Sequence, residues 1–150
     1  MIDIIVDTNV LVSIIDSKDK WNATTLGIIN QIENKKEKIN LIFLDIVINE
    51  SINVLLKRYE SKGMLEKVDE MIDLIEENYN EFIIWASENV EDYHKDILKK
   101  IKDYKGLLNY NDSFIIEYME RNNIRNIISY DIDFDQIELI NRICNVDLKL

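Results

Sequence analysis

The chain has 150 residues, 47% of them hydrophobic, which suits one folded domain over residues 1–150 and excludes an intrinsically disordered protein. Its 29 acidic and 18 basic residues give a formal net charge of −11. This charge argues against broad affinity for nucleic acid, which needs a positive surface. It leaves open a nucleic-acid enzyme whose acidic site holds divalent cations. With only three glycines, the chain has no Gly-rich phosphate loop.

The hydrophobic pattern predicts strands that alternate with helices along the chain. Strands are expected at residues 2–6, 40–44, 81–86, 126–130 and 146–148. Helices are expected at residues 9–17, 20–34, 46–61, 64–79, 90–104 and 134–141, with a further one that opens at Asn111 or Asp112 and runs through Met119. Asp45 is the predicted N-cap of the helix over 46–61, and Gly63 its predicted stop.

This alternation indicates an α/β fold. Apolar strands separated by helices imply βα crossovers, because parallel strands need a long connection. We therefore expect a mostly parallel sheet of four or five strands with helices on both faces.

Two acids follow predicted strands. Asp7 comes directly after the strand over 2–6, and Asp131 comes directly after the strand over 126–130. The carboxyl ends of parallel strands share one edge of a sheet, so these two acids face one crevice if the strands are neighbours. The alternatives are that Asp7 only caps the following helix and that Asp131 and Asp133 only form a turn.

Two more acids are candidates for the same crevice. Asp112 stands at a helix N-terminus, where the helix dipole favours an anion, and Glu50 lies off the apolar stripe of its helix. Either could instead be an ordinary helix acid. If gathered together, the carboxylates would take up protons or bind a cation. Oxygen ligands select Mg²⁺ or Mn²⁺, and such ions can assist attack of water on a phosphodiester.

Four segments together resemble the PIN domain family: residues 5–11, 44–50, 110–115 and 128–134. The resemblance implies a three-layer α/β/α sandwich with Asp7, Glu50, Asp112 and Asp131 as metal-binding and catalytic acids around one or two Mg²⁺ or Mn²⁺ ions. It also implies that Asp133 serves as, or assists, the fourth acid. The Thr8 hydroxyl is expected to hold Asp7 in place, and Asn9 and Ser129 are expected beside it.

Compact PIN domains are often the toxin of a toxin–antitoxin pair of the VapC type and act as Mg²⁺-dependent endoribonucleases. The resemblance therefore implies an RNA substrate, an antitoxin partner and a homodimer. Two alternatives remain open. One is an inactive PIN-like scaffold that binds protein or RNA, and the other is a phosphoaspartate receiver domain.

Basic and aromatic side chains have less specific interpretations. Lys99, Lys100, Lys102 and Lys105 form the densest basic cluster, which is either a solvated face or a guide for a phosphate backbone. Trp21 and Trp85 are interpreted as core or interface residues and not as base-stacking platforms.

The chain is expected to be cytoplasmic. Its N-terminus lacks the basic region of a signal peptide, and no apolar run approaches the ~20 residues that cross a membrane. The single cysteine, Cys144, is interpreted as a small apolar residue in a reducing compartment.

Overall fold

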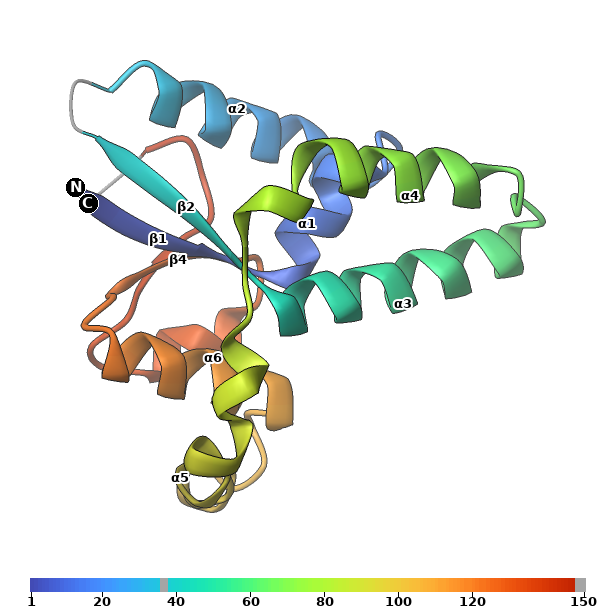
Figure 1. Ribbon diagram of the computed structural model, residues 1–150. Helices are drawn as coiled ribbons and strands as arrows, with labels where there is room; N and C mark the ends of the chain where they lie inside the picture. Colours follow the sequence, from blue (N-terminus) through green and yellow to red (C-terminus); the bar gives the residue numbers. More distant parts are fainter. Residues whose placement is uncertain (36–37, 148–150) are drawn as a thin grey trace.

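The computed structural model describes residues 1–35 and 38–147, which form a parallel sheet of five strands in the order β3-β2-β1-β4-β5 (Figure 1). The strands are β1 (Ile2–Val6), β2 (Ile39–Leu44), β3 (Ile83–Ile84), β4 (Asn126–Ile128) and β5 (Asn141–Ile143). β1 is central, because Ile5 pairs with Ile42 of β2 on one side and with Ile127 of β4 on the other. The predicted parallel sheet is confirmed, and the strands before Asp7 and Asp131 are neighbours.

Helices cover both faces of the sheet, with α1 and α2 on one side and α5 and α6 on the other (Figure 1). The helices are α1 (Thr8–Ile15), α2 (Asn22–Glu33), α3 (Asp45–Lys62), α4 (Lys67–Asn78), α5 (Val90–Asp103) and α6 (Tyr110–Arg121). The chain moves from β1 to β2 and β3 along one half of the sheet and returns to β4 on the other half. Right-handed crossovers then require the connecting helices to change face. The predicted α/β/α sandwich is confirmed.

The core fixes the carboxyl end of β1 and the start of α6. Ile4, Ile5 and Val6 are each at most 1% exposed, as expected for a central strand covered on both faces. On α6, Phe114 and Met119 are 0% exposed. Burying each of these large side chains contributes about 1.5–3 kcal/mol. The backbone that carries the neighbouring polar residues is therefore held firmly.

The ends of α3 agree only partly with the prediction. Gly63 ends the helix in the left-handed conformation, with φ of 65°, which glycine adopts without steric cost. Asp45 is not the N-cap, because α3 begins at Asp45 itself and its cap residue is Leu44. The Asp45 carboxylate instead accepts hydrogen bonds from the backbone amide and the hydroxyl of Ser87. It therefore ties α3 to the segment after β3.

Three predicted strands are wrong in extent or place. The strand expected over 126–130 ends two residues earlier, at Ile128. The strand expected over 81–86 is reduced to Ile83–Ile84, between the short 3₁₀ helices η1 (Asn80–Phe82) and η2 (Ala86–Asn89). Phe82 and Trp85, which suggested a longer buried strand, are 64% and 59% exposed. The last strand is β5 and not residues 146–148. Val146 lies in a bend, and residue 148 lies outside the described residues.

The helix predicted over 134–141 is also wrong, because that region holds the 3₁₀ helix η3 (Ile132–Gln136) and the start of β5. In residues 1–35 and 38–147, no helix combines the length and the hydropathy that a membrane crossing requires.

Candidate active site

A pocket of about 650 Å³ lies where β1 and β4 end. Four of its lining residues are the predicted acids Asp7, Glu50, Asp112 and Asp131. They come from the ends of the two strands, from α3 and from the first turn of α6. The structure therefore brings together side chains that are far apart in the sequence. Asp133 does not line the pocket, but its charge contributes to raising the pKa of Asp112.

Asp7 is the most buried acid of the pocket, at 5% exposure. Its Oδ2 accepts hydrogen bonds from Ser129 Oγ at 2.5 Å and Asn9 Nδ2 at 2.8 Å, and its Oδ1 accepts one from the Thr8 amide at 2.7 Å. Burial raises the pKa of Asp7 to about 7, despite the bonds from Ser129 and Thr8 that favour the ionised form. The residue caps α1, as one prediction held, yet it also faces the pocket.

Glu50 is held by two donors from other elements. Its Oε2 accepts from Thr8 Oγ1 and from Asn111 Nδ2, each at 3.1 Å. The predicted role of Thr8 therefore changes, because its hydroxyl holds Glu50 and only its backbone amide holds Asp7. Through these bonds α3 is connected to the starts of α1 and α6.

Asp112 belongs to a capping box at the start of α6. Its amide donates to Asn109 Oδ1 at 2.9 Å, and its Oδ2 accepts from the Asn109 amide at 3.1 Å. The helix begins at Tyr110 with Asn109 as its cap, so neither Asn111 nor Asp112 opens it. Burial, followed by the charges of Asp131 and Glu50, raises the pKa of Asp112 to about 6. Its carboxylate is therefore both a helix cap and a close neighbour of the other acids.

Asp131 is the cap of η3, and its Oδ1 accepts from the Asp133 amide at 2.9 Å. The Asp131 amide in turn donates to Ser129 Oγ at 3.0 Å, the same hydroxyl that donates to Asp7. Ser129 thus links the turn after β4 to the end of β1.

The donor set suits a hard divalent cation, although the acids do not form a ready-made cage. In the described residues, no group of three or more Asp, Glu, His or Cys side chains is arranged to hold a metal ion. One carboxylate oxygen of Asp112 and one of Asp131 accept hydrogen bonds from backbone amides. In the same part of the chain, no ion pair joins a Lys, Arg or His to any of the four acids. Their negative charge is left for a cation from solution.

Comparison with known proteins settles the family. Residues 4–139 match the family model of the PIN domain. The chain belongs to the PIN domain family. No curated protein sequence gives a significant match.

Two solved structures share the fold of this PIN domain. One is a chain of VapBC2 from Rickettsia felis bound to a DNA fragment from its promoter, with 17% identity, a TM-score of 0.64 and coverage of 94% of this chain and 97% of that chain. The other is VapC20 from Mycobacterium tuberculosis, a toxin that cleaves the sarcin–ricin loop, with 13% identity, a TM-score of 0.66 and coverage of 91% and 96%. At these identities the likeness concerns the fold.

The receiver-domain alternative is excluded by the family match and by the strand order. In this PIN domain β1 lies between β2 and β4. The flavodoxin-like order of receiver domains, 2-1-3-4-5, would instead place β3 beside β1.

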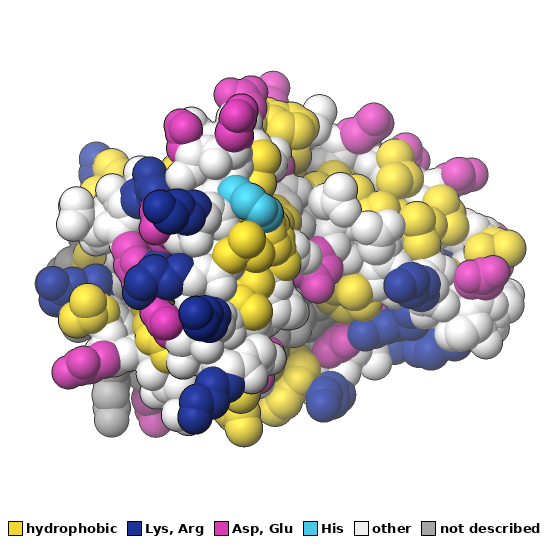
Figure 2. Space-filling view, turned by 90° about the horizontal axis from the view of Figure 1, so that it is seen from below, with side chains coloured by type: hydrophobic (Ala, Val, Ile, Leu, Met, Phe, Trp, Pro, Cys, Tyr) yellow, Lys and Arg dark blue, Asp and Glu magenta, His cyan; other side chains and the backbone are white. Residues whose placement is uncertain are grey.

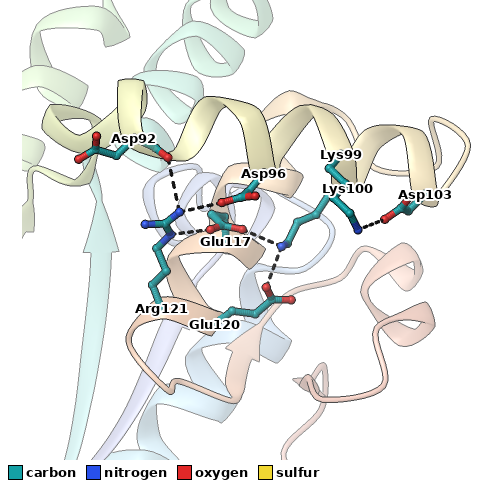
Figure 3. Close-up of polar contacts among 8 residues, drawn as sticks. All are labelled: Asp92, Asp96, Lys99, Lys100, Asp103, Glu117, Glu120 and Arg121. Carbon is teal, nitrogen blue, oxygen red and sulfur yellow. Dashed lines mark hydrogen bonds and ion pairs between the residues drawn. The ribbon is translucent and has the colours of Figure 1, made fainter.

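Two of the four lysines of the predicted basic cluster, Lys99 and Lys100, form ion pairs with acids. Lys100 Nζ lies 2.7 Å from both Glu117 and Glu120, and Lys99 pairs with Asp103 (Figure 3). Figure 2 shows one face of the molecule, on which basic and acidic side chains are intermixed and do not form a patch of one sign. These contacts favour the interpretation as a solvated, salt-bridged face.

Sequence reasoning missed several polar residues that organise the pocket of this PIN domain. Asn111 and Asn109 hold Glu50 and Asp112, and Lys20 lines the pocket wall. Arg58, which the sequence offers as a weaker candidate for guiding a phosphate backbone, lines the pocket as well. Arg58 is engaged with Asp16 and Asp19 at 2.7 Å and 2.9 Å. Asn109 could have been found from the capping pattern Asn109-x-x-Asp112, which predicts a reciprocal cap.

Proposed function

We propose that this PIN domain is a Mg²⁺- or Mn²⁺-dependent endoribonuclease that hydrolyses phosphodiester bonds of RNA. The observation that carries the proposal is the pocket at the ends of β1 and β4, where four acids meet without a cationic partner among the described residues. Membership of the PIN family supports it. So does the RNA-cleaving activity of VapC20, which has a similar fold.

In this proposal Asp7, Glu50, Asp112 and Asp131 hold the ion, with Asp133 as, or assisting, the fourth acid. A bound ion would supply positive charge next to the scissile phosphate and lower the pKa of a water molecule. Asn9 and Ser129 fix the Asp7 carboxylate, and Thr8 and Asn111 fix that of Glu50. We assign no general base to the protein.

The proposal extends to a cytoplasmic toxin of a toxin–antitoxin pair. VapBC2, which contains a chain of similar fold, is a pair of this kind. An antitoxin that donates a basic side chain to the acidic pocket would neutralise the charge that the metal otherwise offsets. A homodimer is proposed from family analogy alone. Co-purification of a short basic partner from native cells tests the toxin role, and consistent isolation of the chain alone would contradict it.

The nuclease proposal is tested by cleavage of tRNA, rRNA and mRNA in Mg²⁺, in Mn²⁺ and in EDTA. Asp7→Asn should lose at least about a hundredfold in rate, because even residues that only support a metal ligand cost 10–100-fold. Asp73→Asn is the matched control, since Asp73 is an exposed acid of α4, and it should keep full activity. Cleavage that survives EDTA, or that Asp7→Asn leaves unchanged, would refute the proposal.

The second candidate is an inactive scaffold that binds RNA or protein. The observation in its favour is that no three of the acids in the described residues are arranged to hold a metal. It predicts no turnover with either ion and no heat of Mg²⁺ binding in calorimetry.

A further inference from the structure

Two stacked aromatic rings stand at the rim of the acidic pocket. Trp21, which precedes α2, and Tyr130, which follows β4, have ring centroids 4.3 Å apart and ring planes that differ by 6°. Both residues line the same pocket as Asp7 and Asp131. The two rings are therefore not an ordinary pair within the core, because each presents surface to the pocket.

The aromatic pair is tied to the acids by hydrogen bonds. The Tyr130 amide donates to Asn9 Oδ1 at 3.1 Å, and the Asn9 side-chain amide donates to Asp7. At its other end, the Tyr130 hydroxyl lies 2.7 Å from Thr25 Oγ1. Tyr130 is thus fixed at both ends, and the plane of its ring has a defined position relative to the Asp7 carboxylate.

The surroundings of the pair suit a nucleobase. Tyr130 occupies one face of the Trp21 indole, and the ammonium of Lys20 lies over the ring, so a base that stacks on the second face would take the place of that ammonium. Lys20, an exposed residue, has its Nζ 5.2 Å from the centroid of the Trp21 ring. Ile132 lies at the same rim and is 69% exposed. An apolar and aromatic surface next to an exposed lysine can hold a flat base and contact its phosphate.

The charge of the protein makes this surface important for affinity. A chain with a net charge of −11 gains little from release of counterions, which supplies most of the affinity of basic proteins for nucleic acid. Stacking of a base on an aromatic side chain does not depend on positive charge, and it needs a base that is unpaired and free to leave its neighbours. The substrate class that fits is therefore an unpaired segment of RNA.

We propose that Trp21 and Tyr130 form a platform on which an unpaired base of single-stranded RNA stacks, so that the adjoining phosphate lies over Asp7 and its neighbouring acids. The platform rests on the proposed function, because it names the residues that position the RNA at the same pocket. It also explains why the stack sits beside the acids and not inside the core. Trp21 is then a specificity residue that selects unpaired over paired RNA.

The two tryptophans of the chain give a direct test. Trp85, on the other side of β2 in the strand order, is 59% exposed and does not line this pocket, so it serves as the matched control. In an Asp7→Asn background, Trp85→Phe leaves Trp21 as the only tryptophan, and Trp21→Phe leaves Trp85. Both proteins are titrated with a 12-nucleotide single-stranded RNA of mixed sequence and with the same strand in a duplex.

We expect the single strand to quench the fluorescence of Trp21 but not of Trp85, and we expect the duplex to quench neither. Trp21→Leu should weaken binding of the single strand by roughly 5- to 150-fold, the range measured for loss of one base stack. Trp21→Phe should retain most of the affinity, since a ring remains, and Trp85→Leu should change it by less than about twofold. Thermal unfolding of each variant identifies any loss that comes from misfolding.

Unchanged Trp21 fluorescence at saturating single-stranded RNA would overturn the platform, as would equal affinity for the duplex or equal losses from Trp21→Leu and Trp85→Leu. The outcome is separable from the nuclease proposal. RNA cleavage by the unmodified protein without a Trp21 response would overturn the platform alone. Quenching of Trp21 without any cleavage would support the platform and refute the nuclease.

Discussion

Asp7 and Glu117 are equally buried acids in opposite surroundings. Each is 5% exposed. Asp7 meets neutral donors and other acids, and its burial raises its pKa to about 7. Burial also acts on Glu117, but hydrogen bonds from Lys100 and Arg121 outweigh it and hold the pKa of Glu117 below its ordinary value. Glu117 has two cationic partners, and Asp7 has none among the described residues.

The two acids also differ in what they join. Glu117 of α6 lies between Lys100 of α5 and Arg121, and these cations reach on to Glu120 and Asp96 (Figure 3). This cluster fastens α5 to α6, and each of its acids is paired with a cation. The four predicted acids of the pocket have no such pairing among the described residues. The comparison teaches that the fold supplies cations where acids hold helices together, and leaves the charge unpaired where a ligand is proposed to bind.

The largest effect on stability is expected from Glu117→Gln. Removing the charge takes away the buried partner of Lys100, whose side chain is 14% exposed, and breaking a buried ion pair costs about 3–5 kcal/mol. We expect a loss of about 3 kcal/mol, because Lys100 and Arg121 each keep a second acidic partner. Urea unfolding at pH 7 measures it. Glu120→Gln is the control, with a loss below about 1 kcal/mol. If Glu117→Gln were as stable as the unmodified protein, the contrast between the ion-paired Glu117 and the unpaired Asp7 would be refuted.

Asp7→Asn is expected to stabilise the metal-free protein at pH 8, in contrast to Glu117→Gln. Raising the pKa from 3.8 to about 7 means that ionised Asp7 destabilises the fold by roughly 4 kcal/mol. The amide removes that penalty but gives up one of the bonds donated to Oδ2, a loss of about 1.5–3 kcal/mol. The net gain should be about 2 kcal/mol, measured by urea unfolding in EDTA. Destabilisation at pH 8 would contradict the account of Asp7 as an uncompensated charge.

The pH dependence sharpens the same contrast. Because the folded protein binds the Asp7 proton more tightly than the unfolded chain does, Asp7 makes the fold less stable as pH rises from about 4 to about 7, by at most about 1.4 kcal/mol per pH unit. The advantage of Asp7→Asn should therefore shrink as pH falls from 8 to 5. The effect of Glu117→Gln should stay level from pH 6 to 8, because Glu117 titrates below its ordinary 4.5 in the fold. If the difference in stability between Asp7→Asn and the unmodified protein did not change with pH, this explanation would be refuted.

The same comparison shows what the sequence could predict. The position of Asp7 follows from one rule, that a polar residue after a buried apolar strand lies at the sheet edge. Glu50 was predictable from its place off the apolar stripe of α3. Predicting that Asp131 lies near Asp7 required the strand order, because both acids follow strands that had to be neighbours. The pairing of Val6 with Ile128 confirms that β1 and β4 are neighbours.

Other features left no signal in a single sequence. β5 has one buried apolar residue, Ile143, so pairing with β4 and not hydrophobicity makes it a strand. The link from Thr8 to Glu50 spans elements whose approach depends on the packing of α1 against α3. The stack of Trp21 on Tyr130 likewise depends on where two loops meet. Long-range partners of this kind are fixed by the tertiary fold and not by local pattern.

The smallest expected effect is stabilisation by Mg²⁺. It tests whether the unpaired acids of the pocket, and not the paired acids around Glu117, attract the ion. An ion that binds only the folded protein stabilises it by about 1.4 kcal/mol at ten times its dissociation constant. We expect this gain, measured as a rise in melting temperature between EDTA and Mg²⁺ at pH 8, in the unmodified protein and in Glu117→Gln. Asp7→Asn should show little of it, because the most buried acid of the pocket is neutral. If Mg²⁺ stabilised all three proteins equally, the ion would be acting on the general negative charge of the surface, and the unpaired charge of the pocket would not be what attracts it.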